Sequence, residues 1–269
     1  MTDRYAVIGN PVAHSKSPQI HRMFAEQTGE DISYEAILAP LDGFAATVGR
    51  LRKEGYKGCN ITVPFKFEAF NIATELGERA QAAQAANTLK FAGQNIFGDN
   101  TDGVGLVRDI QENLGVRLDD RRVLLMGSGG AAYGVVLPLL AAGAKLTVAN
   151  RTPDKARQLA AAFAAQGLIS VSNYEDLRGR QFDVVINATS SGLSDEMPPL
   201  PEDIFAGNAL GYDMMYGRET PFMAFAREHG ARVADGLGML VEQAAEAFFL
   251  WCNVRPETAP VIAALRKQQ

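Results

Sequence analysis

The sequence is poor in the residues that build disulfide scaffolds and metal sites. It has two cysteines and three histidines in 269 residues. Cys59 and Cys252 lie far apart in the chain, which predicts reduced thiols in a cytoplasmic protein. The histidines, His14, His21 and His229, lack metal-ligand spacing, and the cysteines do not complement them. We therefore predict no metal site.

Long apolar runs and runs of one charge are also missing. No apolar run reaches the roughly 18 residues that a membrane helix needs, and residues 1–5 are followed at once by a strand rather than forming a signal peptide. The formal net charge is −5 without basic clusters, which argues against nucleic-acid and anionic-membrane partners. The length and the 47% hydrophobic content suit two domains with ample core.

A glycine-rich turn between an apolar strand and a helix is the most informative motif. Residues 123–126 are apolar enough for a buried strand, and Gly127, Gly129 and Ala132 follow with Gly-x-Gly-x-x-Ala spacing. These small residues permit the tight turn, the approach of a pyrophosphate and close helix packing, and the helix start then holds the anion. A glycine-rich turn alone is a weak signal, but the strand before it and the helix after it favour a dinucleotide site.

The residues after the next predicted strand, 145–150, indicate which dinucleotide binds. About 20 residues past the glycines, NAD-binding proteins carry an acid that contacts the ribose. This sequence has Arg151 and Thr152 there, with Lys155 one helical turn on. A guanidinium is planar and permanently charged, so it suits a 2′-phosphate, and we predict NADP rather than NAD. Asp154 is close enough to repel a phosphate, unless it only complements the dipole of the following helix.

Strands and helices alternate along the chain, which predicts an α/β protein with parallel or mostly parallel sheets. Strands are expected at residues 4–9, 33–39, 57–62, 87–91, 94–97, 122–126, 145–150, near 169, 182–187, 209–213 and 231–234. Helices are expected at 18–28, 41–54, from 64, 102–114, after 129, 153–166, 220–229, 239–251 and 256–265. The last two helices have no following strand, so the chain is expected to return to the first domain.

Polar residues gather at several of these strand ends, where ligands bind in open α/β sheets. Ser17 either caps the first helix or joins Ser15 in a carboxylate site. Lys66 falls in the first turn of a helix, which the helix dipole disfavours; it is either a solvated surface lysine or a functional one. The run at residues 98–103 is either a turn with a helix cap or part of the same site. The small, polar run at 188–192 is typical of a loop beside a nicotinamide.

Together these motifs resemble the shikimate dehydrogenase family. Each stretch alone is unspecific, but their combination in family order over nearly the whole chain is specific. The one departure noticed, Ile61 where valine is common, is conservative. The matching stretches are residues 15–18, 60–66, 86–88, 100–103, 127–131, 150–152 and 235–244.

The resemblance implies two α/β domains with the active site in the cleft between them. One would be an N-terminal α/β substrate domain with a mostly parallel sheet, residues 1–103 plus 237–269. The other would be a Rossmann-type NADP-binding domain, residues 104–236. The implied activity is the NADPH-dependent, reversible reduction of 3-dehydroshikimate to shikimate, on the pathway to chorismate and aromatic amino acids.

The resemblance also implies roles for individual residues. Lys66 and Asp102 would be the catalytic pair and would contact the substrate, whose carboxylate Ser15 and Ser17 would hold. The substrate's hydroxyl groups would be met by Thr62, Asn87, Asp102, Tyr216 and Gln243. NADP would be bound by Gly127, Ser128, Gly129, Gly130, Ala131, Asn150, Arg151, Thr152 and Lys155, with Thr189, Met214 and Gly236 at the nicotinamide.

Two alternatives remain open at this stage. One is a related dehydrogenase that uses quinate or NAD, although Arg151 and Thr152 argue against NAD. The other is a non-catalytic NADPH-binding sensor, which would have no need for Lys66 and Asp102 at facing strand ends. The expected partner is a small-molecule substrate, with no nucleic acid and no membrane, and the protein is expected to be a monomer or a homodimer.

Overall fold

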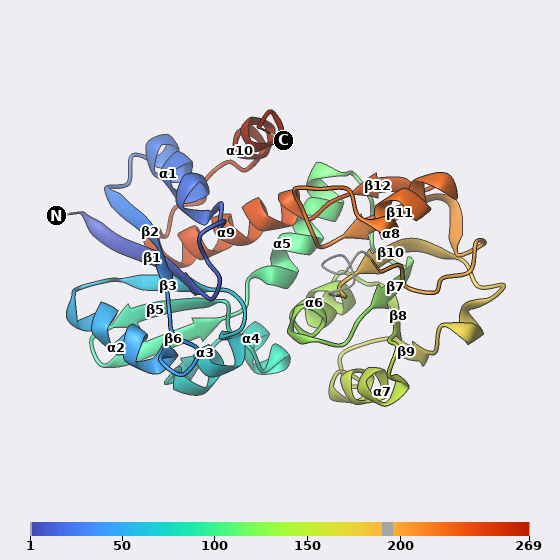
Figure 1. Ribbon diagram of the computed structural model, residues 1–269, viewed down its shortest axis with the longest axis horizontal. Coiled ribbons are helices and arrows are strands. Elements are labelled where there is room, and N and C mark those ends of the chain that lie inside the picture. Colours follow the sequence, from blue (N-terminus) through green and yellow to red (C-terminus); the bar gives the residue numbers. More distant parts are fainter. Residues whose placement is uncertain (1, 190–195, 269) are drawn as a thin grey trace. The chain divides into compact units, whose positions relative to one another are not determined.

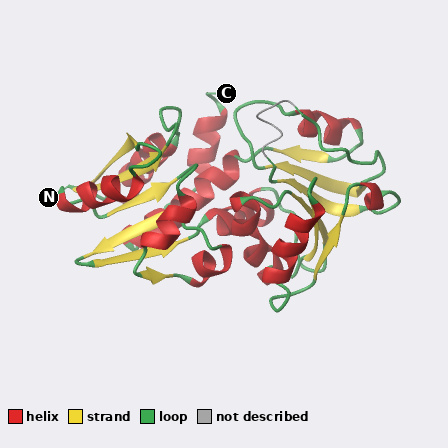
Figure 2. Ribbon diagram, turned by 60° about the horizontal axis from the view of Figure 1, so that its bottom comes forward, coloured by secondary structure: helices red, strands yellow, loops and turns green. Residues whose placement is uncertain are grey.

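The computed structural model describes residues 2–189 and 196–268. The chain forms two compact units: unit 1 is Met1–Gly105 with Val241–Gln269, and unit 2 is Leu106–Leu240. Figure 1 labels the helices and strands of both units, and Figure 2 shows helices on the faces of each sheet. The chain passes from one unit to the other within helix α5 (Asp102–Arg108) and again within α9 (Leu237–Cys252).

Unit 1 is built around a mixed, mostly parallel sheet with the strand order β2-β1-β3-β5-β6-β4. β1 pairs in parallel with β2 and β3, and β4 with β6, whereas β5 is antiparallel to both of its neighbours. This confirms the predicted fold class for the unit. The strands are β1 (Asp3–Gly9), β2 (Ile32–Leu38), β3 (Gly58–Ile61), β4 (Glu75–Leu76), β5 (Thr88–Ala92) and β6 (Asn95–Asp99).

Helices cover both faces of the unit 1 sheet (Figure 1). On one face, Phe44 of α2 stacks on Phe65 before α3, with ring centroids 5.0 Å apart, over the buried side chains of β1 and β3. On the other face, Trp251 of α9 stacks on Tyr5 of β1 at 4.5 Å. The helices are α1 (Ser17–Thr28), α2 (Phe44–Lys53), α3 (Lys66–Ile72), α4 (Glu78–Ala83), α9 and α10 (Ala259–Arg266).

Unit 2 has a fully parallel sheet with the order β12-β11-β10-β7-β8-β9. Numbered from β7, this is the doubly wound 3-2-1-4-5-6 order of dinucleotide-binding folds. Buried apolar runs such as residues 123–126 form its central strands because helices cover parallel sheets on both faces. The strands are β7 (Arg122–Met126), β8 (Lys145–Ala149), β9 (Ile169–Ser172), β10 (Phe182–Asn187), β11 (Phe205–Asp213) and β12 (Arg232–Ala234).

The helical segments of unit 2 include one π-helical turn that the sequence pattern does not predict. The helix expected at 102–114 is α-helical only as α5, and residues Asp109–Asn113 continue it as a π-helix. The buried Asp109 carboxylate accepts a 2.6 Å hydrogen bond from the Tyr212 hydroxyl where this wider turn begins. The other segments are α6 (Gly130–Ala141), α7 (Pro153–Ala162), the 3-10 turn Glu175–Leu177 and α8 (Pro221–Glu228).

Two predicted helix starts are corrected by the structure. α3 begins at Lys66 rather than at Pro64, because Phe65 still bonds back to the Thr62 carbonyl in a turn. α1 begins at Ser17, so this serine is not the N-cap. Ser15 takes part in the turn instead, with its Oγ accepting the Ser17 backbone N–H at 3.3 Å.

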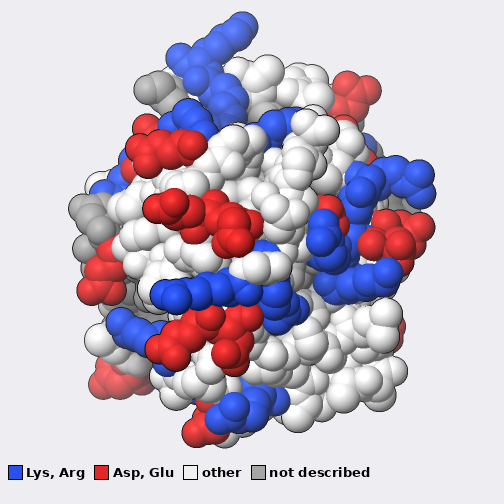
Figure 3. All heavy atoms as spheres, turned by 90° about the vertical axis from the view of Figure 1, so that its right-hand side faces the viewer, with Lys and Arg blue, Asp and Glu red and all other residues white. Residues whose placement is uncertain are grey.

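The surface is mixed in charge on the face drawn in Figure 3, where basic and acidic side chains are interspersed. A search of the described residues finds no helix with the length and apolar character to cross a membrane.

Candidate active site

The carboxyl-terminal ends of strands in unit 1 bring an ammonium and a carboxylate together. Lys66 is the first residue of α3, after β3, and Asp102 is the first residue of α5, after β6. Lys66 Nζ lies 2.6 Å from Asp102 Oδ2, and the two side chains are 22% and 10% exposed. The pair is therefore sheltered yet open to a small molecule.

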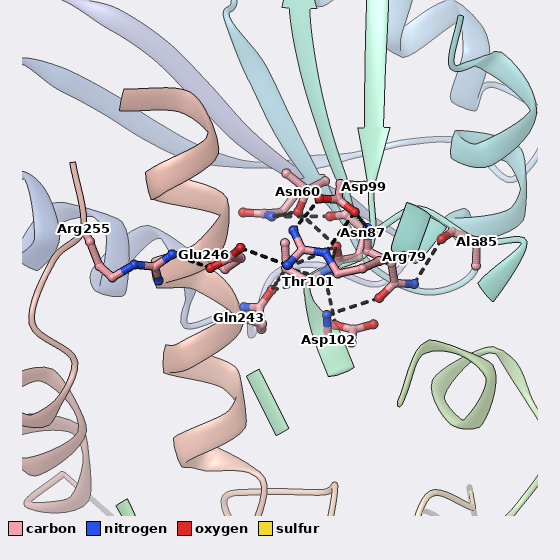
Figure 4. Close-up of polar contacts among 12 residues, drawn as sticks. Asn60, Arg79, Ala85, Asn87, Asp99, Thr101, Asp102, Gln243, Glu246 and Arg255 are labelled. Atoms are coloured by element: carbon pink, nitrogen blue, oxygen red, sulfur yellow. Dashed lines mark hydrogen bonds and ion pairs between the residues drawn. The ribbon is translucent and has the colours of Figure 1, made fainter. Parts of the chain in front are cut away.

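Asn87, immediately before β5, joins three chain segments around this pair (Figure 4). Its Nδ2 donates to Asp102 Oδ1 at 2.8 Å and to Thr101 Oγ1 at 3.0 Å, and it lies 3.4 Å from Gln243 Oε1 on α9. Its Oδ1 accepts the Thr101 backbone N–H at 2.8 Å. These contacts fix Asp102 Oδ1, so that the second carboxylate oxygen, Oδ2, faces Lys66.

A series of hydrogen bonds continues from Asn87 to Tyr34 on β2. The Asn87 Oδ1 accepts from Thr88 Oγ1 at 3.0 Å, and Thr88 Oγ1 in turn accepts from Asn60 Nδ2 at 3.0 Å. The Tyr34 hydroxyl donates to Asn60 Oδ1 at 2.8 Å. Tyr34 on β2 is therefore connected to the Lys66 pair through buried polar groups of one unit.

Thr62 and Ser15 complete the predicted substrate residues of unit 1, and both are half-buried. Thr62 follows β3 and is held by its backbone N–H, which donates to the Ile8 carbonyl at 2.9 Å. Gly9 has to be glycine here, since a Cβ at that position would lie 2.3 Å from the Thr62 methyl group. The contacts bring Lys66, Asn87, Asp102 and Gln243 together, whereas Ser15 and Thr62 bond to their own neighbouring segments.

The glycine turn of unit 2 has the geometry that a pyrophosphate needs. Gly127 has a φ of +113°, and a Cβ there would meet the Ala188 carbonyl at 2.9 Å, so glycine is required. Gly129 is the N-cap of α6 and is exposed, with open space where its Cβ would lie. Ala132 is fully buried against the sheet. With Ser128, Gly130 and Ala131, the turn therefore presents free backbone N–H groups to an anion.

The predicted 2′-phosphate residues lie past β8, and two of them, Asn150 and Arg151, line a depression of about 610 Å³. Arg151 is 89% exposed and lies 3.8 Å from Glu196, a weak contact for so exposed a pair. Asp154, the residue that could repel a phosphate, is in the first turn of α7 and pairs with Arg157 at 2.6 Å. Thr152 is the N-cap of α7, with Lys155 in its first turn, and the Asn150 side chain bonds the Thr152 carbonyl at 3.0 Å.

The depression also contains residues that the sequence analysis missed. Arg178 and Tyr174 line it together with Arg151. Burial raises the pKa of Tyr174 to about 12, and the nearby Arg151 guanidinium opposes the shift. The signal in the sequence is slight, because Arg178 follows a short 3-10 turn and looks like any exposed basic residue.

The ends of β10 and β11 hold the predicted nicotinamide residues through a buried pair that the sequence analysis also missed. Asn187 Nδ2 donates to Asp213 Oδ2 at 3.0 Å. Asn187 Oδ1 accepts from the Thr189 hydroxyl at 2.6 Å, and its carbonyl accepts the Met214 N–H at 3.0 Å. The available signal in the sequence was a polar residue at the end of each of two apolar strands.

Two further predicted residues lie beside these strand ends. Gly236 packs against Met214, since a Cβ on Gly236 would lie 2.3 Å from the Met214 carbonyl oxygen. Tyr216 follows β11, and burial raises the pKa of its hydroxyl group. Of the predicted loop at 188–192, residues 190–192 lie outside the described residues. No group of three potential metal ligands occurs among residues 2–189 and 196–268.

The fold and the site define a dinucleotide-binding α/β oxidoreductase. Three protein-family profiles match the chain: the shikimate dehydrogenase substrate binding domain at residues 7–89, shikimate / quinate 5-dehydrogenase at 108–194, and the shikimate 5′-dehydrogenase C-terminal domain at 236–266. The chain belongs to the shikimate dehydrogenase family, which confirms the resemblance seen in the sequence.

Individual relatives agree with this assignment over the whole chain. Shikimate dehydrogenase (NADP(+)) of Nitrosospira multiformis is 62% identical, over 99% of this chain and 98% of the relative. The crystal structure of an Ael1 enzyme from Pseudomonas putida has a TM-score of 0.94 and 51% identity, covering 98% of each chain. Shikimate 5-dehydrogenase from Thermus thermophilus, in complex with NADP(H) and shikimate, has a TM-score of 0.89 and 33% identity, covering 100% of each chain.

Proposed function

We propose that the protein catalyses the NADP-dependent, reversible reduction of 3-dehydroshikimate to shikimate. The observation that carries the proposal is the sheltered Lys66–Asp102 pair, 2.6 Å apart and surrounded by amide and hydroxyl groups. Membership of the shikimate dehydrogenase family and the NADP(+) named for its relatives support the same activity.

Unit 1 is the substrate-binding unit in this proposal. A substrate with several hydroxyl groups needs a matching partner for each, because polar groups left unpaired on burial cost free energy. Thr62, Asn87, Asp102 and Gln243 offer such partners, and Tyr216 is a further proposed one. Ser15 and Ser17, at the start of α1, would bind the carboxylate with their hydroxyl and N–H groups.

Unit 2 is the NADP-binding unit, and the cofactor supplies the hydride. The turn from Gly127 to Ala131 would hold the pyrophosphate at the start of α6. Asn150, Arg151, Thr152 and Lys155 would bind the 2′-phosphate, with Arg178 as a second guanidinium lining the same depression. Thr189, Met214 and Gly236, at the ends of β10 to β12, would line the nicotinamide.

The Lys66 ammonium would stabilise the negative charge that develops on the carbonyl oxygen and donate the proton to it. Asp102 Oδ2 orients the ammonium, while Oδ1 is held by Asn87. Asp102 would also accept a hydrogen bond from the neighbouring substrate hydroxyl. In the reverse direction the same lysine takes the proton back.

We also propose a cytoplasmic location, which the two free thiols of Cys59 and Cys252 support. A monomer or a homodimer remains the proposed assembly, and size-exclusion chromatography distinguishes the two.

Steady-state kinetics with shikimate and NADP+ test the proposed activity. We expect Lys66→Ala to lower kcat by roughly a hundredfold or more, the contribution of a positioned acid–base group, without changing the affinity for NADP+. Asp102→Asn should be comparably severe. The double variant should be little worse than the worse single variant, because groups that act as a unit are not additive.

Lys53→Ala, an exposed lysine at the end of α2, is the control and should keep wild-type kinetics. If Lys66→Ala raised KM, preserved kcat and combined additively with Asp102→Asn, the lysine would only attract an anionic substrate. Turnover of quinate in place of shikimate would contradict the substrate, but not the reaction class.

A further inference from the structure

Four charged side chains form a cluster behind the active site of unit 1, which we call the Arg79 cluster: Arg79, Asp99, Glu246 and Arg255. Arg79, on α4, donates hydrogen bonds to both carboxylate oxygens of Asp99, with Nε 3.2 Å from Oδ1 and Nη2 bonded to Oδ2. Its third nitrogen, Nη1, donates to Glu246 Oε1 of α9 at 2.9 Å. Arg255 bonds the other Glu246 oxygen at 2.6 Å (Figure 4).

The cluster is too sheltered to be an ordinary surface ion pair. The side chains of Asp99 and Glu246 are 6% and 9% exposed, and that of Arg79 is 24% exposed. Burial alone would raise the pKa of Glu246, but the hydrogen bonds from Arg255 and Arg79 outweigh burial and lower this pKa. Glu246 therefore has two cations, whereas Asp99 depends on Arg79 alone for its charge partner within the cluster.

One path leads from the cluster to the catalytic carboxylate. Asp99 Oδ1 accepts the Asn100 backbone N–H at 2.7 Å as well as the Arg79 bond. The Asn100 side-chain oxygen then accepts the Asp102 backbone N–H at 3.2 Å, while its amide nitrogen donates to the Ala85 carbonyl at 3.0 Å. The position of the Asp102 backbone is thus set through Asp99.

A second path leads from the cluster to the α9 side of the site. Gln243 is three residues before Glu246, so the two side chains lie on the same face of α9. The Gln243 side-chain oxygen lies 3.4 Å from Asn87 Nδ2 and 3.5 Å from Thr101 Oγ1. Because the Arg79 fork bonds Asp99 and Glu246 at once, it ties α9 to the turn that carries Asp102.

We propose that Arg79 is a positioning residue for the reduction, which holds Asp102 and Gln243 at a fixed spacing through Asp99 and Glu246. The assignment rests on the proposed function, since it takes Asp102 and Gln243 as residues that act on the substrate. The role requires a guanidinium, because its planar fork of N–H donors bonds both carboxylates at once. A lysine ammonium could make only some of these bonds.

The test compares Arg79→Lys and Arg79→Met with the wild type in shikimate oxidation. We expect Arg79→Met to lower kcat at least tenfold and to raise KM for shikimate, with NADP+ affinity within twofold of the wild type. The kcat and KM of Arg79→Lys should lie between those of the wild type and those of Arg79→Met. The pH profile of kcat should shift in Arg79→Met, because the placement of Asp102 against Lys66 changes.

A matched control is available in unit 2. Arg122 grips Asp183 with the same two-nitrogen fork, Nε to Oδ2 at 3.2 Å and Nη2 to Oδ1 at 3.0 Å, at the start of β7. Arg122→Met removes a fork of the same geometry from a more exposed pair, away from the strand ends that carry the site, so it should keep the wild-type kcat and pH profile.

A charge-balanced double variant separates positioning from stability. Arg79→Met/Asp99→Asn removes the buried carboxylate together with its partner, so its melting temperature should recover relative to Arg79→Met. Its kcat should stay low, because the fork is still absent. Recovery of kcat along with the melting temperature would overturn the proposal, and so would a folded Arg79→Met variant with wild-type kcat and pH profile.

The same experiment separates the two proposals. If the wild type and Arg122→Met turn over shikimate normally and Arg79→Met does too, only the role of Arg79 is wrong. If the wild type does not turn over shikimate at all, the proposed function fails, and the role of Arg79 fails with it.

Discussion

His21 offers a quantitative test of the structure, because it is a fully buried titratable group that is surrounded mainly by aromatic rings. It lies on α1 and stacks on Tyr34, with ring centroids 4.1 Å apart and an angle of 8° between the rings. Phe24, Phe248 and Trp251 surround it at 5.4–6.1 Å. Among the described residues, neither ring nitrogen has a hydrogen-bond partner. The imidazole therefore has little compensation for a positive charge.

Burial lowers the pKa of His21 to about 3, with nearby Asn60 opposing the shift slightly. In the unfolded chain the imidazole takes up a proton below about pH 6.5, whereas in the folded protein it stays neutral. The free energy of unfolding therefore falls by about 1.4 kcal/mol for each pH unit below 6.5, until the folded pKa is reached. At pH 5 the accumulated loss is about 2 kcal/mol.

Urea unfolding of the wild type and His21→Phe at pH 7.5 and pH 5 measures this loss. Trp251 is the only tryptophan and lies 5.4 Å from the His21 ring, so its fluorescence reports on this region. Phenylalanine fills a similar volume and sacrifices no hydrogen bond, so the variant should be within about 1.5 kcal/mol of the wild type at pH 7.5. At pH 5 the free energy of unfolding of the variant, taken relative to that of the wild type, should be about 2 kcal/mol higher than at pH 7.5.

The control variant is His14→Gln, which removes an exposed imidazole and is unfolded under the same conditions. Equal losses of stability in the wild type and in His21→Phe between pH 7.5 and pH 5 would refute the reasoning. A large loss for His21→Phe at pH 7.5 would show that the ring nitrogens do have partners.

Two further predictions concern the ligands. Arg151→Ala should weaken NADPH binding roughly tenfold or more, the value of a charge-assisted hydrogen bond, and barely affect NADH; equal losses in titrations of both cofactors would contradict the 2′-phosphate assignment. Replacing Ser15 and Ser17 together with alanine should raise KM for shikimate at unchanged NADP+ affinity, and a collapse of kcat at constant KM would instead mean that the serines act on the transition state.

The elements that the sequence predicted well are those whose signals are local. The run at residues 123–126 and the turn at Gly127 specify a strand and a helix start within a few residues. The positive φ of Gly127 and the complete burial of Ala132 confirm the mechanical roles inferred for them. The parallel sheet of unit 2 agrees with the alternation of strands and helices in the sequence, which indicated parallel strands but not their order.

The elements that were missed depend on partners far away in the chain. β4 has two residues and α4 has six, too short to show any periodicity. Arg79, on α4, looks in sequence like a solvated helix residue, and its role depends on Asp99 and on Glu246, 167 positions away. The buried Asn187–Asp213 pair also joins two different strand ends, 26 positions apart in the chain. Such contacts can be identified only when the folded structure shows which strand ends lie together.

Lys66 shows how a local conflict in sequence can point to a site. Its place at the first position of α3 sets a positive charge beside the positive end of the helix dipole, which costs free energy. The structure supplies the compensation from another segment: Asp102, at 2.6 Å, whose own place at the first position of α5 is the one that a helix dipole favours for a carboxylate. Two oppositely charged residues at two helix starts stabilise each other, but an apolar residue at position 66 would avoid the helix-dipole cost altogether. The local conflict is therefore consistent with the role that we propose for Lys66, since reduction of a ketone places negative charge on oxygen and a nearby cation stabilises it.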